Sequence, residues 1–400
     1  MAVTESEILA VTGNEAVAEA MGQIDPDVVC AYPITPQTEV VQLYAQMVAD
    51  GKVGTEFVTV ESEHSAMSAV IGSAAGGART MTATSSQGFA LMWEVLFVAA
   101  SYRLPVVMTT VNRALSGPIN IHCDHSDTMG GRDTGWIQLY GENHQEAYDN
   151  CIQAVRIGEH MDVRLPVMHM YDGYVISGAI GPLQMLTKEH VQEFIGPYRA
   201  VNPMLDARHP VTVGPFDGLH GWYFEHKVAQ NRAMERSFKV IQDVADDFAT
   251  VSGRRYGLLD PYRLEDAEIA IVVVGSTAGT TRMTVDKLRA RGVKAGMARV
   301  RVFRPFPYDE YAEALQHVKV VGVLDRADSF GAQGGPVFME VRSALYDCDP
   351  RPQVLPFIYG LGGRDIVPDN IEQAFAELEK AAGSTKRVST ERRYLNLRKD

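Results

Sequence analysis

Short apolar runs alternate with helix-length segments over the first 170 residues, and this alternation limits the fold more than any other feature of the chain. The runs that predict strands lie at 28–32, 56–60, 80–83, 105–110 and 166–170. The segments that predict helices lie at 14–21, 38–49, 64–74, 89–101 and 143–160. Strands joined by single helices form right-handed βαβ units. The fold class that we predict is therefore α/β, with a doubly wound, mostly parallel sheet.

A second α/β pattern follows an irregular stretch, with apolar runs at 269–275, 296–302 and 320–325. We therefore predict a first domain over 1–258, whose part from about 182 to 258 is an arm or linker, and a second, smaller domain over 259–385. Residues 224–251 predict a long amphipathic helix within the arm. The basic tail, 386–400, is expected either to be disordered or to strap a partner.

Charge and cysteine usage exclude several classes of function. The net charge of −13 argues against nucleic acid or an anionic membrane as the main partner. No apolar run approaches the ~20 residues that span a bilayer, and the N-terminus lacks a signal-peptide pattern, so we expect a cytoplasmic protein. Cys30, Cys123, Cys151 and Cys348 are scattered, without a C-x-x-C pair. A disulfide framework, a zinc site and an iron–sulfur cluster held by this chain alone are therefore unsupported.

The segment Tyr32-Pro33-Ile34-Thr35-Pro36-Gln37 follows the first predicted strand. Each proline fixes its own φ and disfavours helix at the residue before it, so Ile34 and Thr35 are held in a stiff elbow. Open α/β sheets bind ligands at the carboxyl ends of their strands, which is where this elbow lies. An ordinary strand-ending turn is the alternative, and it loses weight because two carboxylates follow the next predicted strand.

Those carboxylates, Glu61 and Glu63, stand at the start of a predicted helix rich in alanine and serine. A carboxylate at this place is often a simple cap, favoured by the helix dipole. The alternative is a carboxylic acid with a raised pKa that shares a proton with a ligand nitrogen. The sequence pattern alone supports both interpretations equally, for either residue.

The loop 113–136 has no periodicity, and a loop of this length is usually functional or mobile. Its run His122-Cys123-Asp124-His125-Ser126-Asp127 could supply metal ligands. Polar loops usually satisfy their own backbone, however, so we predict no metal site. Glycine-rich pieces at 72–77, 275–279 and 331–335 follow neither the Walker nor the dinucleotide pattern, and we interpret them as tight turns between strand and helix.

Five short motifs occur in a fixed order: Tyr-Pro-Ile-Thr-Pro at 32–36, Glu-Ser-Glu at 61–63, Thr-Ala-Thr-Ser-Ser-Gln-Gly at 82–88, Asn-Arg-Ala-Leu-Ser at 112–116 and Arg-Pro-Phe-Pro at 304–307. Together they resemble the α subunits of pyruvate:ferredoxin oxidoreductases, in the 2-oxoacid:ferredoxin oxidoreductase family. The resemblance runs from about residue 13 to residue 368. It implies a domain that binds the pyrimidine of thiamine diphosphate, followed by a smaller domain like the C-terminal domain of transketolase.

The resemblance also assigns roles to particular residues. Glu63 matches the glutamate that bonds N1′ of the cofactor's aminopyrimidine, and Pro33, Ile34 and Thr35 match the elbow beside the reactive carbon. Thr35 and Arg113 match residues that hold the 2-oxoacid, and a planar guanidinium suits its carboxylate. A threonine at position 35 favours pyruvate over oxalate in this family. Catalytic roles are therefore expected for Glu63, Thr35 and Arg113, and the loop around residues 122–127 is expected to cover the site.

The chain lacks the Gly-Asp-Gly motif with following asparagines that binds Mg²⁺ and diphosphate, and it lacks cysteine clusters. By the resemblance, a β subunit would bring the diphosphate site, Mg²⁺ and at least one [4Fe–4S] cluster, with γ and δ subunits as further candidates. The expected reaction is the reversible conversion of pyruvate, CoA and oxidised ferredoxin to acetyl-CoA, CO₂ and reduced ferredoxin. The alternatives are the same chemistry on 2-oxoglutarate or a branched 2-oxoacid, a mainly structural assembly subunit, or a transketolase-like or NAD-linked component.

Overall fold

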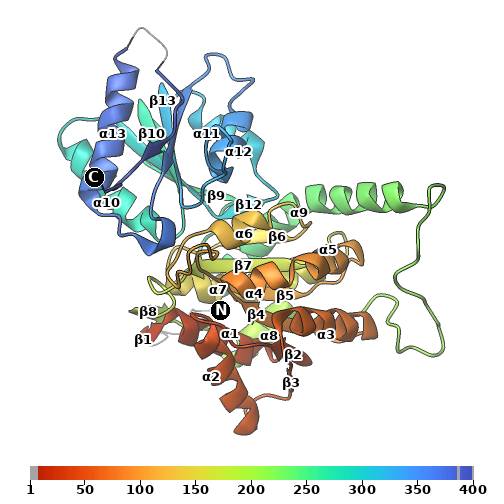
Figure 1. Cartoon of the computed structure of the whole chain (residues 1–400). Coiled ribbons are helices and arrows are strands. Elements are labelled where there is room, and N and C mark those ends of the chain that lie inside the picture. Colours follow the sequence, from red (N-terminus) through yellow and green to blue (C-terminus); the bar gives the residue numbers. More distant parts are fainter. Residues whose placement is uncertain (1–7, 385–387, 399–400) are drawn as a thin grey trace.

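The computed structural model describes residues 8–384 and 388–398, which form two α/β domains, the second stacked on the first in Figure 1. A seven-stranded sheet is the core of the first domain, in the order β12-β6-β7-β5-β4-β2-β3. Its strands are β2 (Val28–Ala31), β3 (Glu56–Thr59), β4 (Thr80–Thr84), β5 (Val107–Asn112), β6 (Ile137–Tyr140), β7 (Val167–Asp172) and β12 (Val302–Arg304). Neighbouring strands are parallel except β12 and β6. The predicted α/β fold is confirmed.

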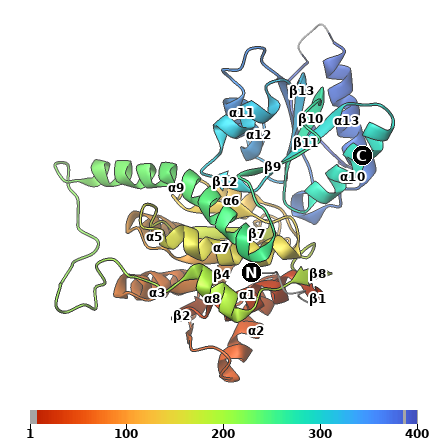
Figure 2. The ribbon, with the colours of Figure 1, turned by 180° about the vertical axis from the view of Figure 1, so that it is seen from behind.

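Helices cover both faces of this sheet, as Figures 1 and 2 show. One face packs against α1 (Gly13–Ile24), α2 (Thr38–Ala49), α7 (His144–Glu159) and the C-terminal half of α9 (Tyr223–Ser252). The other packs against α3 (Glu63–Gly76), α4 (Ser86–Leu91), α5 (Trp93–Ser101) and α6 (Ser126–Gly130). Helix α8 (Lys188–Ile195) contacts α1 and α7. Because both faces are covered, the central strands β4, β5 and β7 are buried along their whole length.

The five predicted strands of the first domain correspond to β2, β3, β4, β5 and β7, and two features were missed. One is β6, which directly follows the long polar loop. The other is a separate antiparallel ribbon of β1 (Ile8–Thr12) and β8 (Ile180–Gln184). Strand β8 contains Gly181 and Pro182, residues that are depleted in strands, so its sequence carries no strand pattern.

A six-stranded sheet is the core of the second domain, in the order β15-β14-β13-β10-β11-β9, and only β9 runs antiparallel to its neighbour. Its strands are β9 (Leu259–Tyr262), β10 (Ile269–Val274), β11 (Ala295–Val300), β13 (Val320–Asp325), β14 (Gln353–Ile358) and β15 (Arg393–Tyr394). Its helices are α10 (Thr277–Ala290), α11 (Tyr308–Leu315), α12 (Pro336–Ala344), the short 3₁₀ turn η1 (Leu361–Gly363) and α13 (Pro368–Ala382).

The strand predicted at 296–302 is two strands in two different sheets. Strand β11 ends at Val300, and β12 then pairs with β6 of the first sheet. Between them, the buried Arg301 donates to Asn150 and Gln153 of α7. The chain after residue 259 thus contributes an edge strand to the first sheet. The predicted domain boundary at 258 does not account for this strand.

The described part of the basic tail, 388–398, belongs to the second domain. Strand β15 pairs with β14, Arg392 donates to Asp328 (2.8 Å), and Arg393 donates to Glu377 (2.5 Å). Disorder therefore does not describe this segment, because it forms a strand and its arginines find acidic partners within the chain, and the strap on a partner stays a prediction. Residues 386, 387, 399 and 400 of the predicted tail lie outside the described residues.

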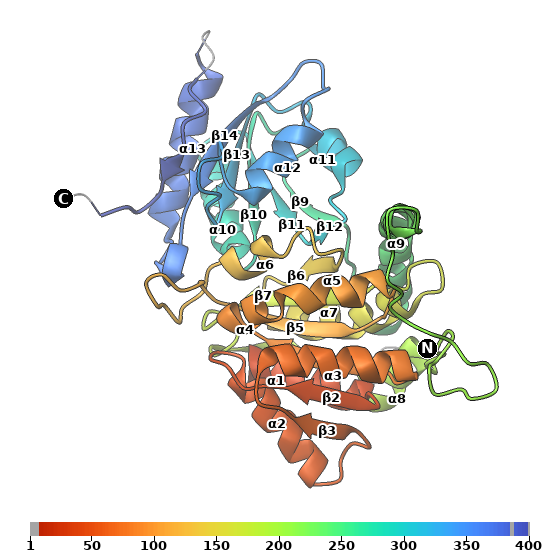
Figure 3. The same cartoon turned by 45° about the vertical axis from the view of Figure 1, so that its right-hand side comes forward.

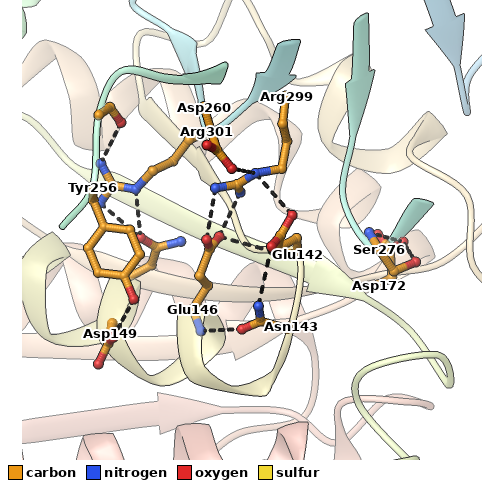
Figure 4. A network of polar contacts seen from close by, with 12 residues as sticks. Glu142, Asn143, Glu146, Asp149, Asp172, Tyr256, Asp260, Ser276, Arg299 and Arg301 are labelled. Atoms are coloured by element: carbon orange, nitrogen blue, oxygen red, sulfur yellow. Dashed lines mark hydrogen bonds and ion pairs between the residues drawn. The ribbon is translucent and has the colours of Figure 1, made fainter. Parts of the chain in front are cut away.

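Buried ion pairs join the two domains, as Figure 4 shows. Arg299 of β11 donates through both Nη atoms to Glu146 of α7, at 2.7 and 2.8 Å. Asp172, the last residue of β7, accepts from Ser276 in the turn after β10. Arg326, which follows β13, donates to the same carboxylate at 2.8 Å. The carboxyl ends of parallel strands in the two sheets therefore meet at one seam.

Among the described residues, no helix is both long and apolar enough to cross a lipid bilayer.

Candidate active site

The predicted site residues lie at the carboxyl ends of neighbouring parallel strands. The elbow follows β2, a turn at 85–88 follows β4, and Arg113 follows β5. Glu63 is the first residue of α3, after the short connection from β3. Strand β2 lies between β3 and β4, so these segments gather at one edge of the sheet. This edge is where an open α/β sheet binds its ligands.

Hydrogen bonds with two buried side-chain amides, Asn14 and Gln37, fix the elbow. The Ile34 N–H donates to Oε1 of Gln37 (3.2 Å), and Nε2 of Gln37 donates to the carbonyl of Ala83 in β4 (3.0 Å). Nδ2 of Asn14 donates to the Pro36 carbonyl (2.9 Å). Pro33 and Thr35 remain exposed and Ile34 is half-buried. The elbow is therefore a rigid support that presents the Thr35 side chain outward, away from the sheet's core.

The two carboxylates at the start of α3 lie in opposite environments. The helix begins at Glu63 because the Ser62 hydroxyl accepts from the Ser65 N–H and caps it. Glu61 is exposed, and the hydrogen bond from the Ser65 hydroxyl lowers its pKa. Glu63 is buried, and burial raises its pKa. The cap interpretation thus fits Glu61, and the acid with a raised pKa fits Glu63.

A close turn covers the Glu63 carboxyl. A Cβ on Gly88 would lie 2.7 Å from Oε1 of Glu63 and 2.6 Å from Oγ1 of Thr84, so only glycine allows α4 to begin there. The hydroxyls of Thr84 and Ser85 are buried, and neither has a hydrogen-bond partner within the described residues. Among the described residues, no other side chain forms a hydrogen bond with Glu63 either. A buried carboxyl with free hydroxyls beside it can bond the nitrogens of a heterocycle, so these residues fit an aminopyrimidine.

Arg113 is buried and held from two sides. Its Nη1 donates to the Thr35 carbonyl (2.9 Å), and its Nε donates to the Asn120 carbonyl (3.0 Å). Within the described residues, Nη2 has no partner. The structure therefore brings Arg113 and Thr35 together as predicted, and the guanidinium keeps donor capacity for an anionic group.

Sequence reasoning missed Asp127, which joins three of these segments. Its carboxylate accepts from the N–H of Ser86 (3.1 Å), the N–H of Arg113 (3.0 Å) and Nδ2 of Asn112 (2.9 Å). Burial raises the pKa of Asp127 to about 6, against these donors, which favour its charged form. Asp127 was assigned to a loop that satisfies its own backbone, and nothing in the sequence distinguishes it from Asp124. Its hydrogen bonds instead fix the ends of β4 and β5.

The loop around residues 122–127 contains one cluster of groups that can bind metal. Atoms of Cys123, His125 and Asp172 lie within 4.8 Å of one another. Nε2 of His125 lies 2.8 Å from Oδ1 of Asp172, and Arg326 and Ser276 bond the other oxygen. These bonds hold the pKa of Asp172 well below its usual range although burial opposes this. The cluster is explained as an ion-pair network between the domains.

Comparison with known proteins identifies the family. Residues 19–246, more than half of the chain, match a family model described as "Pyruvate flavodoxin/ferredoxin oxidoreductase, thiamine diP-bdg", and residues 267–371 match "Pyruvate:ferredoxin oxidoreductase core domain II". The chain belongs to the pyruvate:ferredoxin oxidoreductase family. Each match contains most of one sheet: β2 to β7 of the first sheet lie within the first match, and β10, β11, β13 and β14 of the second sheet lie within the second.

Relatives within this family align over nearly the full length. Pyruvate synthase subunit PorA of Thermotoga maritima is 54% identical, over 98% of this chain and 98% of the relative. The subunit of the same name from Methanocaldococcus jannaschii is 45% identical, over 94% and 96%. Ketoisovalerate oxidoreductase subunit VorA of Pyrococcus horikoshii is 41% identical, over 94% and 95%.

Solved structures share the fold. The 2-oxoglutarate:ferredoxin oxidoreductase of Magnetococcus marinus superimposes with a TM-score of 0.70 at 21% identity, over 94% of this chain and 66% of that one. A split-gene transketolase superimposes with a TM-score of 0.55 at 12% identity, over 94% of this chain and 100% of that one. The predicted architecture, a cofactor-binding α/β domain with a smaller transketolase-like domain, is confirmed at the level of the fold.

Proposed function

We propose that this chain acts in the cytoplasm as the α subunit of a thiamine-diphosphate-dependent pyruvate:ferredoxin oxidoreductase. The reaction is the reversible conversion of pyruvate, CoA and oxidised ferredoxin to acetyl-CoA, CO₂ and reduced ferredoxin. One observation carries the proposal: a buried carboxyl with a raised pKa, Glu63, at the edge of the sheet where Thr35 and Arg113 also lie. The family models and the full-length relatives named pyruvate synthase support it.

The residues divide the work by their chemistry. Thiamine diphosphate, when bound, would supply a nucleophilic carbon and an acceptor for the electron pair left on the substrate carbon when CO₂ departs. Glu63 would hold a proton at N1′ of the aminopyrimidine and so make the 4′-amino group of the ring more acidic. Arg113 binds the 2-oxoacid carboxylate, and the Thr35 hydroxyl lies beside the reacting carbon. Pro33 and Ile34 hold the wall of the pocket.

The rest of the site belongs to other chains in this proposal. A β subunit would bind the diphosphate through Mg²⁺ and hold a [4Fe–4S] cluster that accepts the electrons. Further subunits, γ and δ, are candidate members of the complex, with ferredoxin as the electron acceptor. The exposed Thr35 and Pro33 at the same edge as Glu63 support a partner at this place.

The experiment compares two carboxylates two residues apart in the complex purified with its partner subunits. Glu63→Gln should lower pyruvate- and CoA-dependent viologen reduction about 10²- to 10⁴-fold, the usual share of a proton-transferring group. Glu61→Gln, the matched control, should leave activity near the wild-type rate because Glu61 is exposed. A Glu63→Gln complex of normal composition and full activity would refute the catalytic role.

A second candidate substrate is a branched 2-oxoacid, because a ketoisovalerate oxidoreductase subunit is 41% identical to this chain. A panel of pyruvate, 2-oxoisovalerate and 2-oxoglutarate, assayed with the wild-type complex, decides among the candidates. We expect pyruvate to give the highest kcat/KM. A higher kcat/KM with another member of the panel would reassign the substrate and leave the role of Glu63 intact.

A further inference from the structure

Within the predicted arm or linker of about 182–258, residues 202–227 project from the first domain. From here on, the arm means these residues alone. No helix or strand forms over 202–222, and Figures 1, 2 and 3 show this segment as a long excursion away from both sheets. Helix α9 then begins at Tyr223, and its first buried residue is Ala233. At 1.5 Å per residue, roughly 15 Å of this helix precedes its first buried residue.

The tip of the arm is apolar and exposed. Five large side chains between 216 and 224 are 62 to 101% exposed: Phe216, Leu219, Trp222, Tyr223 and Phe224. The same nine residues contain a single acidic group, Asp217, which accepts from the Trp222 N–H within the arm. Burying one such side chain is worth about 1.5–3 kcal/mol, so a cluster of this size left in water marks a docking surface. Its partner surface must be apolar and nearly uncharged.

The base of the arm rests on the far ends of α3 and α5; α3 begins at the candidate active site, and α5 follows α4, which begins at the turn at 85–88. The Met204 N–H donates to the carbonyl of Ala75 near the end of α3, and Nζ of Lys227 donates to the Ser101 hydroxyl at the end of α5. Helix α3 starts with Glu63, so its 14 residues place the base of the arm roughly 20 Å from the site.

An apolar path connects the two ends. Leu91, Trp93, Phe97 and Tyr102 are exposed along α4, α5 and the residue that ends α5. Ser68 and Gly72, both small and exposed, lie on the neighbouring α3. Figure 3 shows α3, α4 and α5 on the same side of the sheet, with the arm continuing beyond them. A body that covers Glu63 and lies along these helices would reach the arm.

We propose that the arm clasps the same partner subunit that completes the Glu63 site, and that its apolar tip docks on an uncharged surface of that subunit. The inference rests on the proposed function for the existence of this partner. It adds a second attachment point, at the opposite end of α3 and α5 from the chemistry. The surface from Glu63 through Trp93 and Phe97 to Trp222 then forms one continuous interface.

The first test is assembly of the complete complex. The triple variant Phe216→Ser, Leu219→Ser, Trp222→Ser should raise the apparent dissociation constant for the β subunit at least about 100-fold, because buried aromatic anchors dominate interfaces. The control is Met283→Ser, Phe330→Ser, Tyr346→Ser, three exposed apolar residues of the second domain, which should assemble normally. Circular dichroism and Tm of the isolated subunit should be unchanged in both. Normal assembly of the arm variant would overturn the proposal.

The second test identifies the occupant directly. Leu219→Cys, labelled with a benzophenone maleimide, should cross-link to the β subunit in the active complex. Three native cysteines are buried and Cys348 is half-buried, so the label reports on position 219, with the unsubstituted protein as control. A cross-link only to a second copy of this chain would overturn the proposal. The failure of the proposed function is separable, since it would show as an assembled wild-type complex without oxoacid activity.

Discussion

Glu61 and Glu63 have one residue between them, yet the pKa of Glu61 is lowered and that of Glu63 is raised. Ser62 caps α3, so Glu61 stays outside the helix and Glu63 enters its first turn. Outside, the Ser65 hydroxyl reaches the Glu61 carboxylate. Inside, the turn at Gly88 approaches Glu63 so closely that water is displaced. One capping residue therefore decides which carboxyl can hold a proton for a ligand.

This difference predicts opposite effects of amide substitution on stability. Burial raises the pKa of Glu63 above its unfolded value, so its ionisation destabilises the folded chain as the pH rises through the folded pKa. We expect Glu63→Gln to have a higher Tm than the wild type at neutral pH, and the gap should close as the pH falls toward about 4. Thermal unfolding of the cofactor-free subunit between these pH values measures it.

Glu61→Gln is the matched control, and its sign is reversed. The pKa of Glu61 is lowered by its hydrogen bond with Ser65, so this group stabilises the fold above its unfolded pKa and loses that effect on acidification. The variant should therefore be slightly less stable than the wild type at neutral pH. A Glu63→Gln variant whose Tm follows the wild type at every pH would show that Glu63 is not desolvated in the free subunit.

At the scale of elements, the loop after β5 connects Arg113, the proposed carboxylate-binding residue, to the second domain. The Asn120 carbonyl accepts from Arg113, and Nδ2 of Asn120 donates to the carbonyl of Gly362 (2.9 Å). The Gly362 N–H donates to Asp124 (2.9 Å). Gly362 has φ +61°, and a Cβ there would lie 2.5 Å from Nδ2 of Asn120. The loop thus fits against one glycine turn of the second domain.

Asn120 is therefore expected to position Arg113. Asn120→Ala removes the hydrogen bond to Gly362, worth about 0.5–1.5 kcal/mol, and should raise the KM for pyruvate about 2- to 12-fold with the KM for CoA unchanged. Ile119→Ala is the control, because Ile119 is an exposed neighbour in the same loop. Steady-state kinetics of the complex measure both. Equal increases in the two KM values would indicate general loosening of the loop and contradict the positioning role.

The elements that the sequence pattern predicted are those with their own periodicity. The five strand runs of the first domain and the long helix α9 were found within a few residues of their observed ends. Strand β12 was missed as a separate strand, because Val300 and Val302 on either side of Arg301 read as one run while the chain moves from one sheet to the other. For the candidate site, the ordered motifs predicted Glu63, Thr35 and Arg113, and the structure brings them to one edge of the sheet, while their roles stay a proposal. Asp127 and Asn120 act through tertiary contacts that leave no periodic signal.

At the scale of the whole molecule, the seam between the domains contains a network of charged groups. Arg299 bonds Glu146 and also lies within 3.2 Å of Glu142 and Asp260. Both of these acids have a second cation, Arg282, whereas Glu146 bonds no other cation within the described residues. Removal of Arg299 therefore affects Glu146 most, because Glu142 and Asp260 keep Arg282.

These pairings predict how substitutions at the seam change the free energy of unfolding. Arg299→Met leaves the buried Glu146 without its cation and should lower the free energy of unfolding by about 3–5 kcal/mol. Adding Glu146→Leu removes the stranded charge, and the double variant should regain at least half of that loss, although Leu cannot replace the bond from the Glu142 N–H. Urea unfolding of the isolated subunit measures the free energy of unfolding of both variants, and calorimetry checks it independently. A double variant less stable than Arg299→Met alone would show that packing around Glu146, and not its unpaired charge, holds the two domains together.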